Sequence, residues 1–369
     1  MNNVITFYNQ SYWEVRNLEL FDPQFDSINP RYTYTFRRGI LVSAEDIGTM
    51  THLYFDNLYI HGFRGPNNND GKSAGGIIFN IYSTPYNPSA RVRTNIDDVR
   101  ITNCELAQLG RSGINYITPW TTKTGDKWAN FDYVGLGEWM PYTNFYIANN
   151  IFHDIDGDGA IIDNNQDAVV EHNIVYTTAK NCDYAVGLFP WNSKDIIFQY
   201  NEVYDIQRVP GDGQGIEIDA INENIYVQYN YLHDNAGGFL LWCSTDTLPS
   251  YNGVYRYNIS QNDNSYSGFI DWRVNHHGSM AYNNTIYMGA GATREFMRND
   301  ANRTADAKFY NNIFYNEGEL TSVKFNESNI DWEANLFYGF DKVPGNDGKA
   351  IRPIRNSSRP APAPMASTR

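Results

Sequence analysis

One short pattern of polar and apolar positions recurs along almost the whole chain. Each copy is an Asn, then two or three apolar residues, then a polar turn, as in NIFH at Asn150 and NIVY at Asn173. The copies begin at Asn17, Asn57, Asn103, Asn150, Asn173, Asn201, Asn230, Asn258, Asn284, Asn312 and Asn335. From Asn150 onward their spacings are 23, 28, 29, 28, 26, 28 and 23 residues. Repeats of about 20–50 residues are typical of a solenoid.

The residues between the Asn positions have the pattern of strands. Runs such as AVVEHNIVYTT and DIIFQYNEVYDI alternate apolar and polar residues, and clusters of Gly, Asn and Asp separate them. No amphipathic helix longer than two turns is evident, which excludes helical repeats and an αβ horseshoe. The pattern predicts an all-β chain, a single-stranded parallel β-helix of about eleven coils with three sheets. We expect the repeated Asn to occupy a left-handed bend and to stack as a hydrogen-bonded ladder.

The spacing also predicts how the chain is organised. Residues 1–345 form one β-helix domain, and the Pro-, Ala- and Ser-rich tail 346–369 is expected to be disordered. The first three spacings are longer, at 40, 46 and 47 residues, so the excess must leave the coils as loops. We place these loops at 65–76, 83–94 and 118–143. Long loops on one side of a solenoid usually wall a binding surface.

Composition excludes several classes of function. The net charge of −14 disfavours nucleic acid and anionic membrane surfaces as partners. Three Cys are too few for a disulfide framework, and no run of about 18 apolar residues suggests a membrane span. The N-terminus MNNVITFYNQ shows no signal peptide.

A second repeat indicates which strand positions face outward. Seven segments align as a Gly followed by a short strand: GIIFN at 76, GINYI at 113, GAIID at 159, GLFPW at 187, GIEID at 215, GFLLW at 238 and GFIDW at 268. The position after Gly is always apolar, so it should face the core. Because successive strand side chains face opposite ways, the second and fourth positions after that Gly should then face outward.

That outward set contains residues suited to sugar chemistry. The expected sugar-stacking residues are Trp191, Trp242 and Trp272, and the expected acids and bases are Glu217, Asp219 and Asp163. Glu217 and Asp219 are two residues apart, which separates their β-carbons by roughly 6.5–7 Å, near the lower limit for an inverting glycosidase. Asp163 lies two coils away, roughly 9.5 Å by stacking. Two structural alternatives stay open: the Asp residues as turn formers, and the Trp residues as packing under a loop.

Further residues are candidates near this face. Asp212, in the loop before the Glu217 strand, and the Asp156 and Asp158 pair could serve as an alternative acid or bind Ca²⁺. His276 is expected to border the cleft, and the nearest basic residues by repeat offset are Lys180, Arg208 and Arg273. His153 and His233 share one offset from their Asn, which predicts a structural role for both.

The phrases NNIF, HNIVY and QYNEV, with AVGLFPWNSKDIIFQYNEVYDI, GDGQGIEIDA and NIYVQYNYLHDNAGGFLLWC, resemble the right-handed parallel β-helix proteins of the pectate-lyase-like superfamily. The resemblance covers roughly residues 10–340. It implies right-handed coiling, an active site on one sheet, and polysaccharide processing outside the cytoplasm, secreted or periplasmic in a bacterium. A glycan sequon at Asn258, a ladder position, argues against a eukaryotic secreted origin.

Three hypotheses follow for function. The first is a glycoside hydrolase that needs no cofactor, with Glu217, Asp219 and Asp163 as catalytic carboxylates and a neutral, hemicellulose-like polysaccharide over the Trp column. Arg273, Asp212 and His276 would contact that substrate. The second is a polysaccharide lyase that abstracts a proton from a uronate with a basic residue, with Ca²⁺ as helper. The third is a non-catalytic carbohydrate-binding solenoid. Under each of these three hypotheses we expect the protein to be a monomer.

Overall fold

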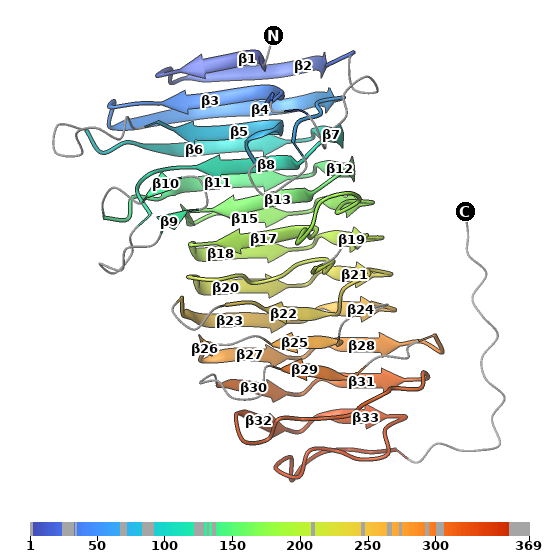
Figure 1. Cartoon of the computed structure of the whole chain (residues 1–369). Coiled ribbons are helices and arrows are strands. Elements are labelled where there is room, and N and C mark those ends of the chain that lie inside the picture. Colours follow the sequence, from blue (N-terminus) through green and yellow to red (C-terminus); the bar gives the residue numbers. More distant parts are fainter. Residues whose placement is uncertain are drawn as a thin grey trace.

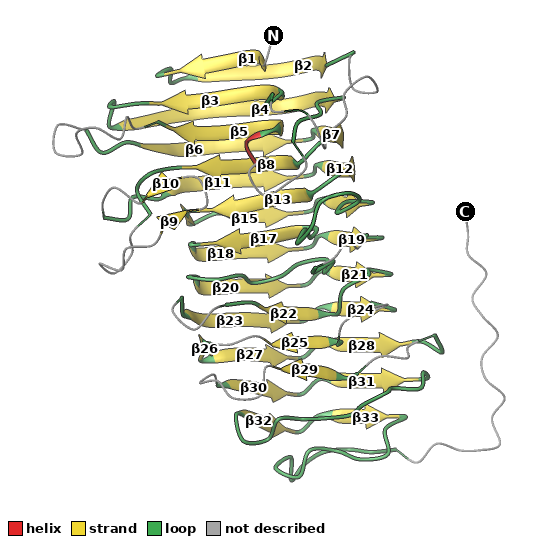
Figure 2. Ribbon diagram, in the orientation of Figure 1, coloured by secondary structure: helices red, strands yellow, loops and turns green. Residues whose placement is uncertain are grey.

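The protein is a stack of coils that follow one another in chain order along a single axis (Figure 1). The structure, a computed structural model, describes residues 3–23, 33, 35–66, 72–82, 92–121, 129–130, 133–134, 138–207, 211–244, 248–263, 268–272, 275–291, 295–299 and 306–353. Within these ranges the chain is strands and loops apart from one short helical turn at Lys72–Ser73 (Figure 2). No helix in the described ranges is long and apolar enough to cross a membrane.

The strands of successive coils lie on three faces, which we call the first, second and third sheets. The coil that carries Glu217 has no strand of its own on the first sheet and joins it only through isolated bridges at Ile216 and Ile218. The first sheet contains β1 (Asn3–Tyr8), β3 (Arg38–Ala44), β5 (Gly75–Ile81), β8 (Ser112–Ile117), β13 (Asp158–Asp163), β17 (Leu188–Trp191), β22 (Leu240–Trp242), β25 (Ile270–Trp272) and β29 (Met297–Asn299). The second contains β2 (Trp13–Phe21), β4 (Thr49–His61), β6 (Asn95–Thr102), β11 (Tyr142–Ala148), β14 (Asn165–Gln166), β15 (Val169–Glu171), β18 (Lys194–Gln199), β20 (Glu223–Gln228), β23 (Ser250–Arg256), β26 (His276–His277), β27 (Ser279–Tyr282), β30 (Ala307–Tyr310) and β32 (Ile330–Glu333). The third contains β7 (Glu105–Leu109), β12 (Ile151–Ile155), β16 (Ile174–Tyr176), β19 (Glu202–Tyr204), β21 (Tyr231–His233), β24 (Ile259–Gln261), β28 (Thr285–Met288), β31 (Ile313–Asn316) and β33 (Leu336–Tyr338), and the second halves of β2 and β4 bend into it.

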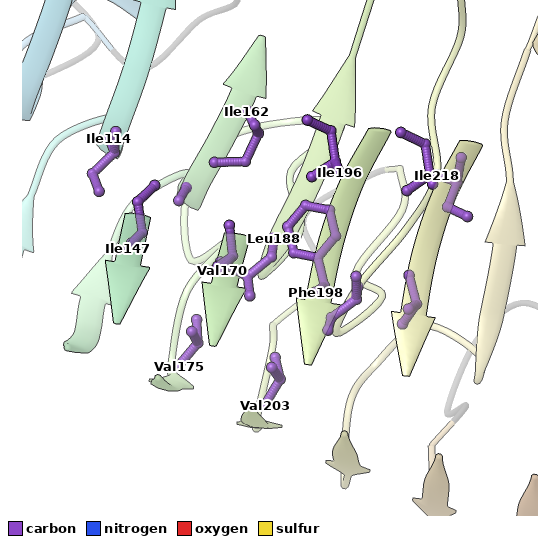
Figure 3. Close-up of a cluster of buried hydrophobic side chains, with 14 of the residues drawn as sticks. Ile114, Ile147, Ile162, Val170, Val175, Leu188, Ile196, Phe198, Val203 and Ile218 are labelled. Atoms are coloured by element: carbon purple, nitrogen blue, oxygen red, sulfur yellow. The ribbon is translucent and has the colours of Figure 1, made fainter. Parts of the chain in front are cut away.

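The core is a continuous apolar column enclosed by the three sheets. Ile162 and Leu188 from the first sheet, Phe198 from the second and Val203 from the third meet on neighbouring coils (Figure 3). All four side chains are fully buried. Burial of one such side chain stabilises the fold by about 1.5–3 kcal/mol. Because every coil repeats the contact, the stability of the solenoid is distributed along its axis.

A ladder of buried Asn side chains runs along the bend between the second and third sheets. The Nδ2 of Asn201 donates to Oδ1 of Asn230 at 3.0 Å, and Asn230 repeats this contact with Asn258 at 3.0 Å. The backbone N–H of each Asn donates to the same oxygen of the next, as from Asn201 to Asn230 at 3.0 Å. The members are Asn150, Asn173, Asn201, Asn230, Asn258, Asn284, Asn312 and Asn335. The predicted ladder is therefore present over these coils.

The left-handed bend is one residue away from where we expected it. Positive φ belongs to the residue before each ladder Asn, for example Tyr200 at 55° and Tyr229 at 56°. The ladder Asn residues from Asn150 onward do not have a positive φ, and their side-chain amides point inward. In the N-terminal coils the order changes, because Asn57 and Asn103 are themselves left-handed at 52° and 55°. There Cys104, not Asn103, lies opposite Asn150 and donates its N–H to that side chain at 2.9 Å.

The predicted structural histidines lie on the outer surface of the third sheet. The His153 ring stacks on Tyr176 at 5.0 Å between centroids, and Tyr204 stacks on His233 at 4.8 Å. The Nδ1 of His153 also lies 2.9 Å from Asp154, to which the Lys180 ammonium binds at 2.9 Å. Lys180 therefore lies with the histidine stack and not on the first sheet.

The ordered C-terminal end extends beyond the predicted domain boundary at residue 345. Asp347 is buried and ends the Asn ladder, accepting hydrogen bonds from Asn335 N–H at 3.1 Å and Nδ2 at 3.0 Å. Ile351 pairs with Leu336 of β33. The low-complexity tail thus begins later than predicted, because Asp347 supplies the acceptor that the last ladder Asn needs. Residues 354–369 lie outside the described residues.

All three predicted loops fall partly outside the described ranges, at 67–71, at 83–91 and, in the third, at 122–128, 131–132 and 135–137. Within the third, β9 (Ala129–Asn130) and β10 (Tyr133–Val134) form an antiparallel pair that belongs to none of the three sheets. The chain does leave the coil in this segment, as the long spacing predicts.

Candidate active site

The outward face of the first sheet carries the candidate site. On β13, Ala160 and Ile162 contact the core while Ile161 belongs to a separate apolar cluster on the other side. Leu188 of β17 pairs with Ile216, and Ile216 and Ile218 also contact the core. The predicted alternation therefore holds for these coils, and Asp163, Trp191, Glu217 and Asp219 face outward.

Trp242 does not continue this outward column, which corrects the prediction. Ile218 pairs with Trp242, and the N–H of Cys243 donates to Ile218 O at 2.9 Å. The Trp242 indole is fully buried in the core, with Tyr255 5.9 Å and Phe309 5.7 Å from it between ring centroids.

The physical reason is a break in the alternation just after Gly238. Phe239 and Leu240 are consecutive residues, yet both contact the core. One extra residue in a strand turns every following side chain to the opposite face. The gap-free alignment of GFLLW with GIEID missed this shift, and it is Cys243 that lies beside Asp219.

Trp272 follows the same shift and is also a core residue. It pairs with Trp242 in the register of β22 and β25, and only 3% of its surface is exposed. Of the three predicted stacking residues, Trp191 alone faces outward, where it packs against the cluster of Ile161, Val186 and Phe189.

The outward apolar side chains are covered, so they do not form the exposed stripe that the sequence suggested. Leu41, Ile78 and Ile117 make one buried cluster on this face, and Ile161 and Phe189 belong to a second. Buried polar side chains lie among them. The face opens to solvent at Lys72, Trp191, Asp219 and Cys243, which are each partly exposed. This opening, which we call the site mouth, is where a ligand can reach the sheet.

Carboxylates are concentrated at the site mouth. Asp212 and Glu217 are buried at 8% and 3% exposure beside the partly exposed Asp219, and Asp163 lies one coil from Trp191. The pKa of Asp219 is raised to about 7, chiefly because burial disfavours its charged form and next because of the negative charge of Asp212. The Ala220 N–H, donating at 2.8 Å, Lys72 and the Cys243 thiol oppose this rise.

Such a carboxyl group suits proton donation. A carboxylic acid that stays protonated near neutral pH, beside a second carboxylate, has the properties of a general acid in glycosidic cleavage. Asp212 is therefore better placed than the sequence indicated. It was expected to contact substrate or to serve as an alternative acid. In the structure its negative charge acts on the carboxyl group of Asp219.

His276, expected at the cleft border, is instead part of the interior. It is fully buried, its Nε2 lies 2.8 Å from Cys243 O, and burial lowers its pKa to about 4. It pairs with Ser250 at the bend between the first and second sheets. The structure thus places this imidazole inside the coil and not at the border of the site mouth. Arg273 and Arg208 lie outside the described residues.

Two residues of the site mouth were missed from the sequence. Lys72 comes from the loop 65–76, whose path no periodicity encodes, although it is the one cationic residue in GPNNNDGKSAGG. Cys243 was hidden by the register shift after Gly238. Asp158, one of the Ca²⁺ candidates, forms a fully buried ion pair with Arg111. In the described ranges no three His, Cys, Asp or Glu side chains gather as a metal site.

Comparison with known proteins adds the handedness and a class of relatives. Residues 94–254 match the family described as right-handed β-helix region. The chain is 29% identical over 399 aligned residues to a lacto-N-biosidase of Bifidobacterium longum subsp. longum, covering 92% of this chain and 24% of that protein. It also resembles crystal structures of the GH136 lacto-N-biosidase from Eubacterium ramulus, native and selenomethionine forms, at 25% identity and TM-scores of 0.63 and 0.65.

The chain is a right-handed parallel β-helix, the fold of pectate-lyase-like proteins. This confirms both the predicted fold class and the predicted resemblance. The β-helix spans about a quarter of the Bifidobacterium relative and about half of the Eubacterium chain, since the matches cover 86% of this chain and 51% of that one.

Proposed function

We propose that this β-helix is a glycoside hydrolase whose catalytic carboxylates are Asp219 and Asp212. The observation that carries the proposal is the Asp219 carboxyl, whose pKa of about 7 follows from burial and from the neighbouring Asp212 charge. Its partly exposed position at the site mouth lets it reach a glycosidic oxygen. The similarity to lacto-N-biosidases supports the same class of reaction.

In this proposal Asp219 is the general acid that protonates the leaving oxygen. Asp212 is the partner carboxylate that acts on the opposite side of the sugar, either directly or through a water. Glu217 and Asp163 hold the surrounding negative charge, which stabilises an oxocarbenium-like transition state. The partly exposed Trp191 indole offers an apolar surface on which a sugar ring stacks.

For the substrate we propose a neutral glycan of the kind that a lacto-N-biosidase cleaves. The relatives carry that name, and the net charge of −14 disfavours a polyanionic polymer. A hemicellulose-like polysaccharide is the second candidate, and its support is reduced because Trp242 and Trp272 do not extend the stacking surface. The proposal requires no cofactor, so activity should survive dialysis against a chelator.

The test is a substrate panel with matched variants. Chromogenic β-glycosides, including a lacto-N-bioside, and hemicelluloses are incubated with wild type, Asp219→Asn and Asp212→Asn, and sugar release is measured. The exposed Asp331, on the second sheet, supplies the control Asp331→Asn. We expect both site variants to lose about 10²–10⁴-fold in rate while the control keeps wild-type activity.

Three results would overturn the proposal. Full activity of Asp219→Asn would remove Asp219 from the reaction. Release of unsaturated uronates from acidic polymers, seen as new ultraviolet absorbance, would establish a lyase instead. Binding of glycans with no turnover of any substrate would favour a non-catalytic solenoid.

A further inference from the structure

Lys72 is held across the outward face of the first sheet by contacts at both of its ends. Its backbone carbonyl accepts a hydrogen bond from Nδ2 of Asn115, on β8, at 2.9 Å. Its ammonium nitrogen lies 5.7 Å from the ring centroid of Phe189, on β17. These strands are two coils apart, or about 9.6 Å along the axis. The side chain therefore extends along the solenoid toward the coil that carries Asp219.

The ammonium group meets charges from several elements. The charge of Arg111 disfavours the positive charge of Lys72, and Asp158, which forms a fully buried ion pair with Arg111, favours it. Asp219 and Asp163 of β13 also stabilise the positive charge of Lys72. Dense packing around Lys72 lowers its own pKa, which places it in a low-dielectric setting where such interactions are strong.

Among the described residues, three side chains act on the charge of Asp219. Asp212 from the preceding loop raises its pKa, and Lys72 and the Cys243 thiol lower it. Glu217 lies two residues away in the same segment, and Trp191 lies on the preceding coil, whose Leu188 pairs with Ile216. Lys72 is therefore a cation of the described residues that acts on the carboxylates of the site mouth.

We propose that Lys72 is a positioning residue of this site, which holds the carboxylate cluster together and sets the pH range in which Asp219 donates its proton. The inference rests on the proposed function for its catalytic consequence, but not for the contact itself. Loss of the positive charge should make Asp219 harder to ionise, so that it remains an acid at higher pH. The basic limb of the pH–rate profile should then move upward.

The experiment compares Lys72→Met, which keeps the length of the side chain, with Lys72→Arg, which keeps its charge. The control is Lys194→Met, which removes a lysine from the second sheet that pairs with Glu223 at 3.0 Å. We expect Lys72→Met to shift the basic limb of kcat/KM upward by about half a unit or more, because an opposite charge at this range lowers a carboxyl pKa. Lys72→Arg should restore the wild-type limb, and Lys194→Met should not move it.

A second measurement needs no catalysis. Cys243 is partly exposed beside Asp219, whereas Cys104 and Cys182 are buried and burial raises the pKa of each thiol to about 12. Iodoacetamide should thus label Cys243 selectively, and the site of labelling is read by mass spectrometry. Because the Cys243 thiol hydrogen-bonds to Asp219, we expect the pH midpoint of alkylation to shift in Lys72→Met and to be unchanged in Lys72→Arg and Lys194→Met.

The two measurements separate the two proposals. If the wild type is inactive on every substrate but the pH midpoint of Cys243 alkylation still changes in Lys72→Met, the hydrolase proposal is overturned. The interaction between Lys72 and the site carboxylates is then retained. If the enzyme is active but Lys72→Met changes neither the basic limb of its kcat/KM profile nor the pH midpoint of Cys243 alkylation, the inference about Lys72 is overturned. The hydrolase proposal is then retained.

Discussion

The carboxyl group of Asp212 lies close enough to Asp219 that its negative charge disfavours a charge on Asp219. Together with burial this raises the pKa of Asp219 to about 7. Because an acid must be protonated to act, activity should fall as pH rises through about 7. The pH dependence of kcat/KM, measured between acid and mildly alkaline pH, checks this. A rate that keeps rising above neutrality would contradict the assignment of Asp219 as the acid.

Trp191 and Trp242 should respond differently to replacement by Ala. Trp242 is fully buried in the core, so its loss leaves a cavity and should cost about 3–5 kcal/mol in the free energy of unfolding. Trp191 is partly exposed at the site mouth, so its replacement should cost less than about 1.5 kcal/mol. It should instead weaken substrate binding and raise KM. Denaturant titrations and Michaelis–Menten kinetics on both variants separate the two roles.

The ladder predicts a large cost for Asn230→Ala. Asn230 Oδ1 accepts both from the backbone N–H and from Nδ2 of Asn201, and its own Nδ2 donates to Phe198 O and to Asn258. The change leaves buried donors and acceptors without partners, and we expect about 2–4 kcal/mol of destabilisation. Thr285→Ala, at an exposed strand position, is the control and should change stability by less than about 0.5 kcal/mol. Equal stability of the two variants would show that the ladder contributes nothing net.

Asp263 should make stability depend on pH. It is fully buried, and that burial raises its pKa to about 7, although it accepts hydrogen bonds from Asn235 and Ser260. The folded state therefore holds a proton that the unfolded chain has released above pH 4, and stability falls as pH rises toward 7. Asp263→Asn should remove this dependence and stabilise the protein at pH 7–8 by of order 2 kcal/mol. Thermal unfolding of both proteins at pH 5 and pH 8 tests it; a pH slope that persists unchanged in the variant would point to other groups.

Asp347 should stabilise the C-terminal coil. It accepts hydrogen bonds from Asn335 and, at 2.7 Å, from the Ala334 N–H. Asp347→Ala removes these acceptors and should lower the stability of the last coils by about 1–3 kcal/mol. Amide hydrogen exchange should locate the loss in β33, with faster exchange at Leu336. Unchanged protection there would show that the ladder ends without help from Asp347.

The fold was predictable because its determinants recur. The Asn residues that form the ladder, and the apolar residues that follow each Gly, repeat coil after coil, and the structure follows them. The site was only partly predictable. Glu217 and Asp219 were found because their segment keeps the inward and outward alternation of the coils before it, with Ile216 and Ile218 in the core. Trp242 was misplaced because the break after Gly238 leaves no mark in composition.

Lys72 and Asp212 show a different limit of prediction from sequence. Both come from loops, and which coil a loop residue approaches depends on tertiary packing that periodicity does not describe. The sequence identified the loop of Lys72 as a wall of the site, and it named Asp212 as an alternative acid. It did not show that both approach the same carboxyl group, that of Asp219.

The Asn ladder has a consequence for how such a protein changes over evolution. A coil that slipped by one residue would turn its Asn outward and leave the amides above and below it without partners. Insertions and deletions are therefore admitted only where the chain leaves the coils, which is where the loops near the site mouth arise. The ladder fixes the register of the coils that carry Trp191 and Asp219, while substitutions in those loops leave that register unchanged.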